Sequence, residues 1–202
     1  MLKRYSTIIV LVLVISVMTA SGVLAMGKLI NIPTADLSGN NGMIYGELNL
    51  DNSFRQLEGV CTINSQLGIG GSMEFVENEE ADIKLQAKTV FTSGNSNEPA
   101  ISAGIKNDSI YFVISKNIGM GFRAHIGVGN GNLGFFAGFN NVVNPVNVTK
   151  NGESPSPVIN IMGEYANEEL SLGTRIHLQE NIKFDLALVN LKSLKLGLGY
   201  IF

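Results

Sequence analysis

Apolar and polar side chains alternate along most of this chain with a period of two. Successive side chains of a β-strand point to opposite faces, so the alternation predicts strands with one apolar and one polar face. Apolar residues do not recur at helical spacing after the first 25 residues. Twelve segments show the strand pattern: 42–50, 53–64, 66–75, 82–91, 100–106, 109–116, 121–130, 133–140, 157–165, 169–178, 181–190 and 194–202. The chain is therefore predicted to be all-β.

Most connections between these segments are two to six residues long and contain turn-forming residues, as at 51–52, 107–108, 131–132 and 167–168. Such short connections require antiparallel neighbours, because a parallel pair needs a crossover of about a dozen residues or more. The prediction is an up-and-down meander of 10–12 strands. The long connection is 141–156, after the eighth segment. With a periplasmic N-terminus, eight preceding strands predict it on the periplasmic side. Long loops of such barrels normally lie outside the cell, so the alternative is a strand count that is wrong by one before it.

Segment 109–116 differs from the others because it is apolar on both faces, so its orientation stays open.

The first 25 residues have the pattern of an export signal. Lys3 and Arg4 precede an apolar run over 8–18, and Val23-Leu24-Ala25 fits a cleavage site. An uncleaved membrane anchor is the alternative, but about 11 apolar residues fall short of the ~20 that a spanning helix needs. The predicted organisation is a signal peptide at 1–25, an N-terminal segment at 26–41 that leads into the sheet, and a barrel at 42–202.

Segment length favours a sheet that crosses a membrane. About nine residues that rise ~3.3 Å each and tilt by ~40° span roughly 23 Å, close to the ~25 Å apolar band of outer-membrane barrels. No run of 18 apolar residues follows residue 25, so a spanning protein would have to cross as a closed sheet. We predict an antiparallel transmembrane β-barrel of about 12 strands. The alternative is a soluble periplasmic or secreted β-sandwich binding domain, whose strands also alternate.

The last segment places five apolar side chains on one face and ends on an aromatic residue: Leu194, Leu196, Leu198, Tyr200 and Phe202. This ending resembles the closing strand of bacterial outer-membrane β-barrels, which typically finishes on Phe. The resemblance implies a location in the cell outer membrane, with outer-membrane lipid around the barrel. It also implies that Tyr200 and Phe202 act as a C-terminal signal for the barrel assembly machinery.

A second resemblance lies near the start of the predicted mature chain. Residues 30–37, Ile-Asn-Ile-Pro-Thr-Ala-Asp-Leu, followed by Gly42, resemble the "IPTA" segment with which YjbH-type outer-membrane proteins lead into their barrels. Residues 99–105, 113–116, 163–165 and 172–175 resemble the same pattern. Such barrels are associated with exopolysaccharide production. The resemblance implies a structural or pore-like protein that is accessory to export of cell-envelope polysaccharide.

Charged residues of the predicted strands gather on the face opposite the apolar one. An ionised side chain that faces lipid near the midplane costs roughly 2–4 kcal/mol, so this face is expected to line the lumen. The expected lumen-facing residues are Glu47, Glu58, Glu74, Lys84, Lys88, Lys106, Arg123, Glu164, Arg175, Lys183, Asp185 and Lys195. They either form ion pairs that fill a narrow barrel or set up a transverse field in a water-filled pore.

The sequence contains no pattern that indicates catalysis. His125 and His177 are the only histidines. Outer-membrane lipases and deacylases carry a Ser two residues after the catalytic His, and neither histidine here is followed by such a Ser. They and the single Cys61 lack the spacing of metal ligands. A net charge of −3 without a basic patch argues against a nucleic-acid partner. The protein is predicted to be no enzyme and to need no cofactor, with a small solute or polysaccharide as the expected ligand.

Overall fold

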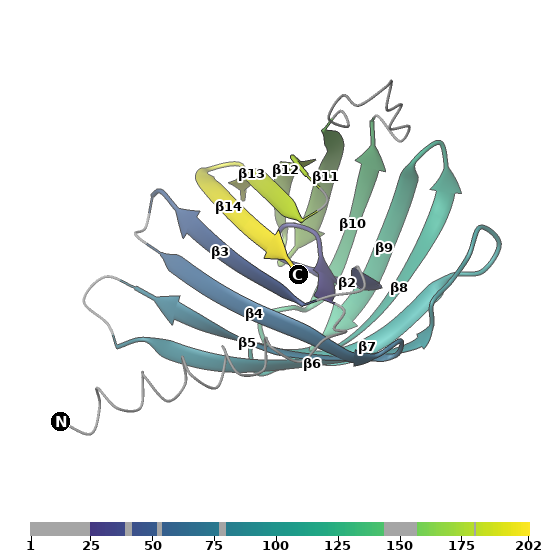
Figure 1. The fold of residues 1–202 in the computed structure, drawn as a ribbon, viewed down its shortest axis with the longest axis horizontal. Helices are drawn as coiled ribbons and strands as arrows, with labels where there is room; N and C mark the ends of the chain where they lie inside the picture. The colour runs from purple at the N-terminus through teal and green to yellow at the C-terminus, as the bar shows by residue number, and fades with distance from the viewer. Residues whose placement is uncertain (1–24, 39–41, 52–53, 77–79, 144–156, 180) are drawn as a thin grey trace.

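Twelve antiparallel strands close into a barrel, as the alternation predicts (Figure 1). The computed structural model describes residues 25–38, 42–51, 54–76, 80–143, 157–179 and 181–202. The barrel strands are β3 (Met43–Asn49), β4 (Arg55–Asn64), β5 (Leu67–Phe75), β6 (Asp82–Thr92), β7 (Ala100–Lys106), β8 (Ser109–Gly119), β9 (Phe122–Gly129), β10 (Phe135–Val142), β11 (Val158–Ala166), β12 (Glu169–His177), β13 (Ile182–Val189) and β14 (Ser193–Ile201). The predicted fold class is confirmed, and the observed ends lie within about three residues of those predicted.

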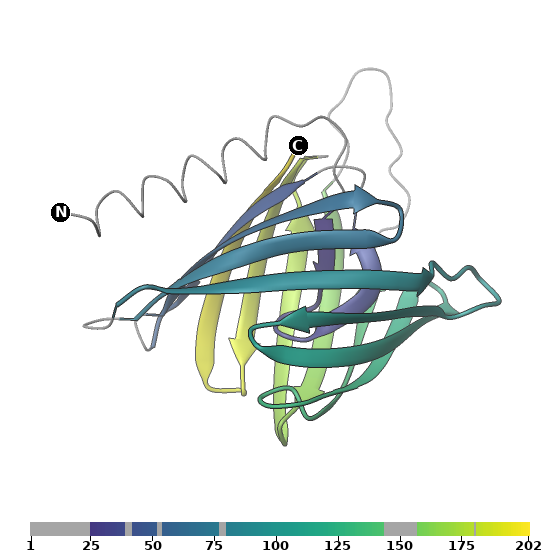
Figure 2. The ribbon, with the colours of Figure 1, turned by 90° about the horizontal axis from the view of Figure 1, so that it is seen from below.

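Strands β3 and β14 pair antiparallel and close the barrel. The backbone N–H of Phe202 donates a hydrogen bond to the carbonyl of Gly42 at 3.0 Å, which extends this seam past the last strand residue. Eight barrel strands, β3 to β10, precede the long connection. The ends that it joins therefore lie at the end of the barrel that carries the C-terminus (Figure 2). Residues 144–156 themselves lie outside the described part of the chain, as does the predicted signal peptide up to residue 24.

Inside the barrel lies a two-stranded antiparallel hairpin formed by β1 (Ala25–Lys28) and β2 (Pro33–Ser38) (Figures 1 and 2). In the described part of the chain, β1 and β2 pair only with each other and not with the barrel wall. Sequence reasoning treats residues 26–41 only as a segment that leads into the barrel, and it predicts neither the hairpin nor its place in the lumen.

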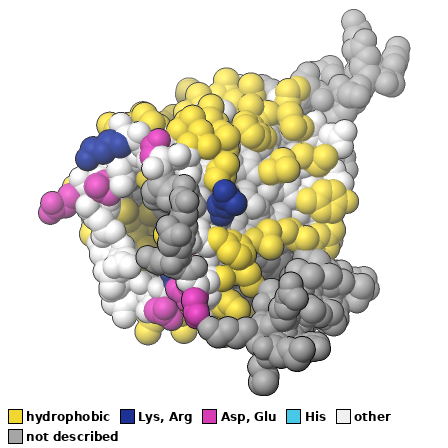
Figure 3. Space-filling view, turned by 90° about the vertical axis from the view of Figure 1, so that its left-hand side faces the viewer, with side chains coloured by type: hydrophobic (Ala, Val, Ile, Leu, Met, Phe, Trp, Pro, Cys, Tyr) yellow, Lys and Arg dark blue, Asp and Glu magenta, His cyan; other side chains and the backbone are white. Residues whose placement is uncertain are grey.

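The outer face of the barrel is apolar. Ile63, Leu186 and Leu198 are 57%, 42% and 60% exposed, although each is a large hydrophobic side chain. Hydrophobic side chains cover much of the side of the molecule shown in Figure 3. A continuous apolar outer surface on a closed sheet is the surface that a bilayer requires.

Within the described residues, no helix is long and apolar enough to cross a membrane.

Candidate functional site: the hairpin and the cavity in the barrel lumen

Barrel side chains take the place of neighbouring strands along the edges of the hairpin. An isolated pair of strands leaves backbone groups on its outer edges without strand partners, and buried backbone groups need them. On β2, the ammonium of Lys88 donates to the carbonyls of Thr34 at 2.7 Å and Asp36 at 2.9 Å. At the end of β1, the guanidinium of Arg175 donates to the carbonyl of Lys28 at 3.1 Å and to that of the next residue, Leu29, at 3.2 Å. Cationic side chains thus satisfy carbonyls on both strands.

The turn of the hairpin is held by an anion. The carboxylate of Glu164 on β11 accepts hydrogen bonds from the backbone N–H groups of Ile30, Asn31 and Ile32 at 3.0, 2.8 and 3.1 Å. It also accepts one from the Asn31 side-chain amide at 2.8 Å. Three converging N–H groups form an anion-binding concavity, so a single buried carboxylate fixes the whole turn.

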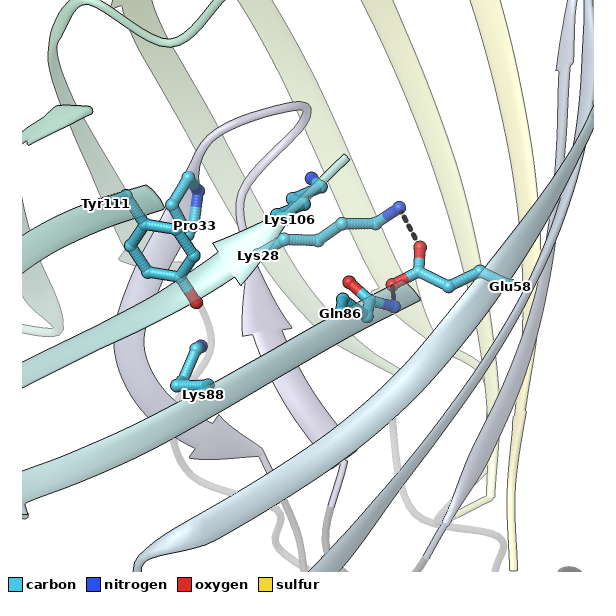
Figure 4. Close-up of a pocket in the computed structure, with 7 residues that line it drawn as sticks. All are labelled: Lys28, Pro33, Glu58, Gln86, Lys88, Lys106 and Tyr111. Carbon is cyan, nitrogen blue, oxygen red and sulfur yellow. Dashed lines mark hydrogen bonds and ion pairs between the residues drawn. The ribbon is translucent and has the colours of Figure 1, made fainter. Parts of the chain in front are cut away.

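Lys28 joins the hairpin to two buried glutamates. Its ammonium lies 3.0 Å from Glu47 Oε1 and 2.6 Å from Glu58 Oε2. Figure 4 shows the bond to Glu58, whose other oxygen accepts from Gln86 at 2.8 Å. Burial by itself would lower the pKa of Lys28, but Glu47 and Glu58 outweigh burial, so its pKa is raised. Lys28 therefore stays charged, and the ion pairs persist, through the ordinary pH range.

A second cluster of polar side chains lies on the wall next to Arg175. The Arg175 guanidinium makes two hydrogen bonds to Asp185, at 2.8 and 2.7 Å. The Tyr45 hydroxyl donates to the same carboxylate at 2.6 Å. The Lys183 ammonium lies 4.9 Å from the centre of the Tyr45 ring, a cation–π distance. These contacts orient Arg175 toward the hairpin.

The end of β2 is held by β8 and β9. Arg123 forms an ion pair with Asp36, and the Ser115 hydroxyl accepts from the backbone N–H of Ala35 at 2.9 Å. His125 lies 2.7 Å from that hydroxyl and 2.8 Å from the side-chain oxygen of Asn140. Ser115 is fully buried, and the Ser115–His125–Asn140 hydrogen bonds connect the hairpin contact to β9 and β10 of the wall. His177 lies on β12 at a half-buried position.

The other side of the hairpin packs against hydrophobic side chains, which we call the apolar wall: Tyr111, Val113, Phe136 and Met162. Leu29, Ile30, Ile32 and Ala35 of the hairpin pack on it, each 4% exposed or less. Gly138 allows the close approach, since a Cβ there would lie 2.5 Å from Leu29 Cδ1. The lumen thus holds a small hydrophobic core.

A cavity of about 630 Å³ remains at the end of the barrel opposite the C-terminus. The hairpin turn forms its floor, and turns between barrel strands form its rim. Its lining is largely polar: Lys28, Asn31, Glu47, Gln56, Glu74, Asp82, Lys84, Lys106, Asn107, Asp108, Ser109, Asn132 and Lys195, with Phe54, Ile30 and Leu133. Glu74 pairs with Lys84 at the rim.

The twelve charged residues singled out from the sequence fall into one set of eight and two separate pairs in the structure. Eight contact the hairpin: Glu47, Glu58, Lys88, Lys106, Arg123, Glu164, Arg175 and Lys195. Glu74 and Lys84 pair at the cavity rim, while Lys183 and Asp185 lie beside Tyr45 and Arg175.

Sequence reasoning missed the partners of these charges, namely Lys28 and Asp36 of the hairpin and the backbone of its turn. Segment 109–116 does contain a signal that the lumen is occupied. Its second apolar face carries Tyr111 and Val113, which pack against the hairpin. Apolar side chains on a lumen face indicate that something other than water occupies the lumen.

Within the described residues, no three His, Cys, Asp or Glu side chains are grouped so that they could hold a metal ion.

The site and the fold together define a class of protein: a closed, lipid-facing β-barrel whose lumen contains an internal hairpin. No protein-family model matches the sequence, and no curated protein matches it significantly. Solved structures do share the fold. The "KdgM porin" superposes with a TM-score of 0.51 at 13% identity, over 80% of this chain and 99% of that one.

Two further solved structures share the fold. The "KdgM porin in complex with disordered oligogalacturonate" has a TM-score of 0.52 at 12% identity, over 80% of this chain and 99% of that one. The Acinetobacter baumannii outer membrane protein Omp33 has a TM-score of 0.50 at 9% identity, over 80% and 98%. This chain thus shares the closed-barrel fold of these proteins, and its outer face carries many exposed hydrophobic side chains.

Proposed function

We propose that this protein is a non-catalytic, porin-like channel that its own N-terminal hairpin holds closed. The observation that carries the proposal is that side chains from most of the barrel strands form hydrogen bonds or ion pairs with the hairpin. Side chains from nine barrel strands reach it: those of β3, β4, β6, β7, β8, β9, β11, β12 and β14. A hairpin bonded on all sides occupies the lumen and blocks diffusion through it.

The type of contact between the hairpin and the wall supports a movable gate in preference to a permanent plug. All of its polar contacts with the wall run through side chains, and its strands pair only with each other within the described residues. It can therefore leave without breaking any strand pairing of the barrel. Loss of the Glu164 carboxylate would leave three buried N–H groups of the turn unpaired, so removal of this anchor should weaken the hold on the hairpin more than removal of a singly bonded one.

We place both ends of the mature chain in the periplasm, as an even number of strands requires when one end lies there. The hairpin then enters from the periplasmic side, the cavity faces the cell exterior, and the connection 141–156 is periplasmic. In this proposal the signal peptide at 1–25 is removed, and Tyr200 and Phe202 present the barrel to the assembly machinery. Cleavage after Ala25 would start the mature chain within β1, which the intact mass of the purified protein checks.

Substituted cysteines test the orientation. With Cys61 replaced first, a cysteine at Asn151 should react with a membrane-impermeant thiol reagent only after the outer membrane is permeabilised. Labelling of intact cells would place this connection outside and reverse the orientation.

Planar-bilayer conductance tests the channel itself. Glu164→Ala removes the carboxylate that holds three N–H groups of the turn, so this variant should spend far more time open than the unaltered protein. Glu169→Ala is the matched control, because Glu169 lies exposed on the adjacent strand β12. Heat-modifiable migration on gels confirms that each variant has folded. If neither Glu164→Ala nor a variant without residues 26–38 conducts ions, the channel proposal is wrong.

We further propose that the permeating solute is carbohydrate-like and that the protein is accessory to polysaccharide export. Support comes from the polar lining of the cavity and from the IPTA-like residues, which form the turn and second strand of the hairpin. One solved porin of this fold is named as a complex with oligogalacturonate. Deletion of the gene should lower the amount of surface polysaccharide, and Glu164→Ala proteoliposomes should swell in oligosaccharide solutions. Unchanged polysaccharide together with swelling in small solutes alone would argue for a general pore.

A further inference from the structure

The floor of the cavity holds one more cation than its carboxylates neutralise. We call this group the floor cluster: Lys28, Lys106, Lys195, Glu47 and Glu58. Glu47 uses one oxygen for Lys28 and the other for Lys195, each at 3.0 Å. Glu58 uses one oxygen for Lys28 at 2.6 Å and the other for Gln86 at 2.8 Å. All four carboxylate oxygens are thus already engaged.

Lys106 is the cation that remains. Its ammonium donates to the neutral carbonyl of Asn31 at 2.7 Å, and no carboxylate among the described residues lies within 4.0 Å of it. Figure 4 shows Lys106 beside Lys28, whose own ammonium is turned toward Glu58. An ammonium has three donors, and a half-buried cation with one neutral partner has a strong preference for an anion. Lys106 lines the cavity, so an anion can reach it there.

The surroundings of Lys106 narrow the class of anion. Asn107, Ser109 and Asn132 line the same cavity and offer amide and hydroxyl groups that pair with hydroxyls. A volume of about 630 Å³ suits a small organic ligand better than an inorganic ion alone. Acidic residues at the rim, Glu74, Asp82 and Asp108, disfavour ligands with several negative charges.

We propose that the cavity binds a monocarboxylated, hydroxyl-rich solute of hexuronic-acid type, with its carboxylate on Lys106. The inference rests on the proposed function for its physiological meaning, because it names a ligand of the same lumen. Binding itself does not require the channel to open. The ligand would also compete with the Asn31 carbonyl for Lys106 and so weaken one anchor of the hairpin turn.

Calorimetric titration of the refolded protein in detergent tests the site with a matched pair of probes. D-glucuronate and D-glucose differ mainly in the carboxylate at C6. Glucuronate should bind with a stoichiometry of one, and glucose should bind at least about tenfold more weakly, as expected when a charge-assisted hydrogen bond is missing. Equal binding of the two sugars, or no binding of glucuronate, would overturn the proposal.

Variants identify the residue. Lys106→Met should weaken glucuronate binding at least about tenfold, while Lys106→Arg retains it because the cation is kept. Lys192→Met is the control, since Lys192 lies exposed in a turn that does not line the cavity. Undiminished binding by folded Lys106→Met would also refute the site. If glucuronate binds through Lys106 but the hairpin-deleted protein conducts no ions, the site stands and the channel proposal fails.

Discussion

Two sets of wall residues hold the same hairpin by different physical means. On the apolar wall, Tyr111 and Phe136 pack against hydrophobic side chains of the hairpin, and the contact depends on buried area. In the other set, which we call the charged wall, Glu47, Glu58 and Lys195 contact it through ion pairs and hydrogen bonds. Hydrophobic packing is non-directional and barely sensitive to ionic strength, whereas ion pairs require exact geometry and an intact partner.

This difference indicates how the hairpin would leave. An anion that enters the cavity meets lysines first, namely Lys28 of the hairpin and Lys106 and Lys195 of the barrel, because all three line the cavity. The four residues of the apolar wall do not line this cavity, so their packing contacts with the hairpin would persist until later. Four substitutions or modifications test this comparison.

The largest effect is expected on the apolar wall. Phe136 is fully buried, and Phe136→Ala should lower the free energy of unfolding by about 3–5 kcal/mol through lost packing and the cavity left behind. Phe54→Ala, in a side chain that lines the open cavity, should cost about 1 kcal/mol or less. Urea titrations in detergent, read by heat-modifiable gel mobility, measure both values. Equal losses would mean that the two sides do not differ in packing.

Arg175→Lys should have an intermediate effect. Lysine keeps the charge but cannot bond Asp185 twice while also reaching the Lys28 and Leu29 carbonyls, so a loss of about 1–3 kcal/mol is expected. The same titration gives the value. Arg55→Lys, at an exposed position on β4, should leave stability unchanged. If Arg175→Lys is as stable as the unaltered protein, charge alone holds the hairpin.

Asp36→Asn should have a small effect that depends on salt. The Asp36 and Arg123 side chains retain 33% and 16% exposure, so their ion pair should contribute about 0–1 kcal/mol. The difference between variant and parent should shrink further in 1 M salt because of screening. If the loss in the free energy of unfolding does not change with salt, the Asp36–Arg123 contact stabilises the protein through its hydrogen bonds and not through its charges.

Lys28 should show no reaction under conditions where exposed lysines react. Acetylation requires the neutral amine, and a raised pKa means that less neutral amine is present at pH 9 than on an ordinary lysine. Stability from this group is complete below the unfolded pKa and is lost only as pH rises through the still higher folded value. Mass spectrometry after acetylation at pH 9 should find Lys192 modified and Lys28 unmodified. Modified Lys28 in folded protein would show that the hairpin is often out of place.

The barrel could be predicted from the sequence because each of its strands carries its own signal. Alternation along 82–91, for example, reflects one face in lipid and one in the lumen, and β6 is found at Asp82–Thr92. Turn residues such as Asn107 and Asp108 adopt the left-handed conformation that a tight turn requires. These signals are local, so the number of strands in the barrel can be counted from the sequence.

The hairpin could not be predicted in this way, because its position depends on partners far away in the chain. Ile30 and Glu164 are 134 residues apart in the sequence but lie in contact. Charge patterning placed Glu164 among the residues of interest without indicating that its partners are backbone N–H groups. The observation that segment 109–116 is apolar on both faces was the one local trace of the hairpin.

The position of the hairpin in the chain also determines the order in which the molecule can be built. The hairpin comes directly before β3, and β3 is one side of the seam that β14 completes. The pairing of Leu48 with Leu196 waits for the end of the chain to arrive, and such long-range closure is intrinsically slow. The hairpin is thus tethered beside the last gap to shut and can enter the curved sheet while that gap is still open. By this route, completion of the wall and enclosure of the hairpin are a single assembly step.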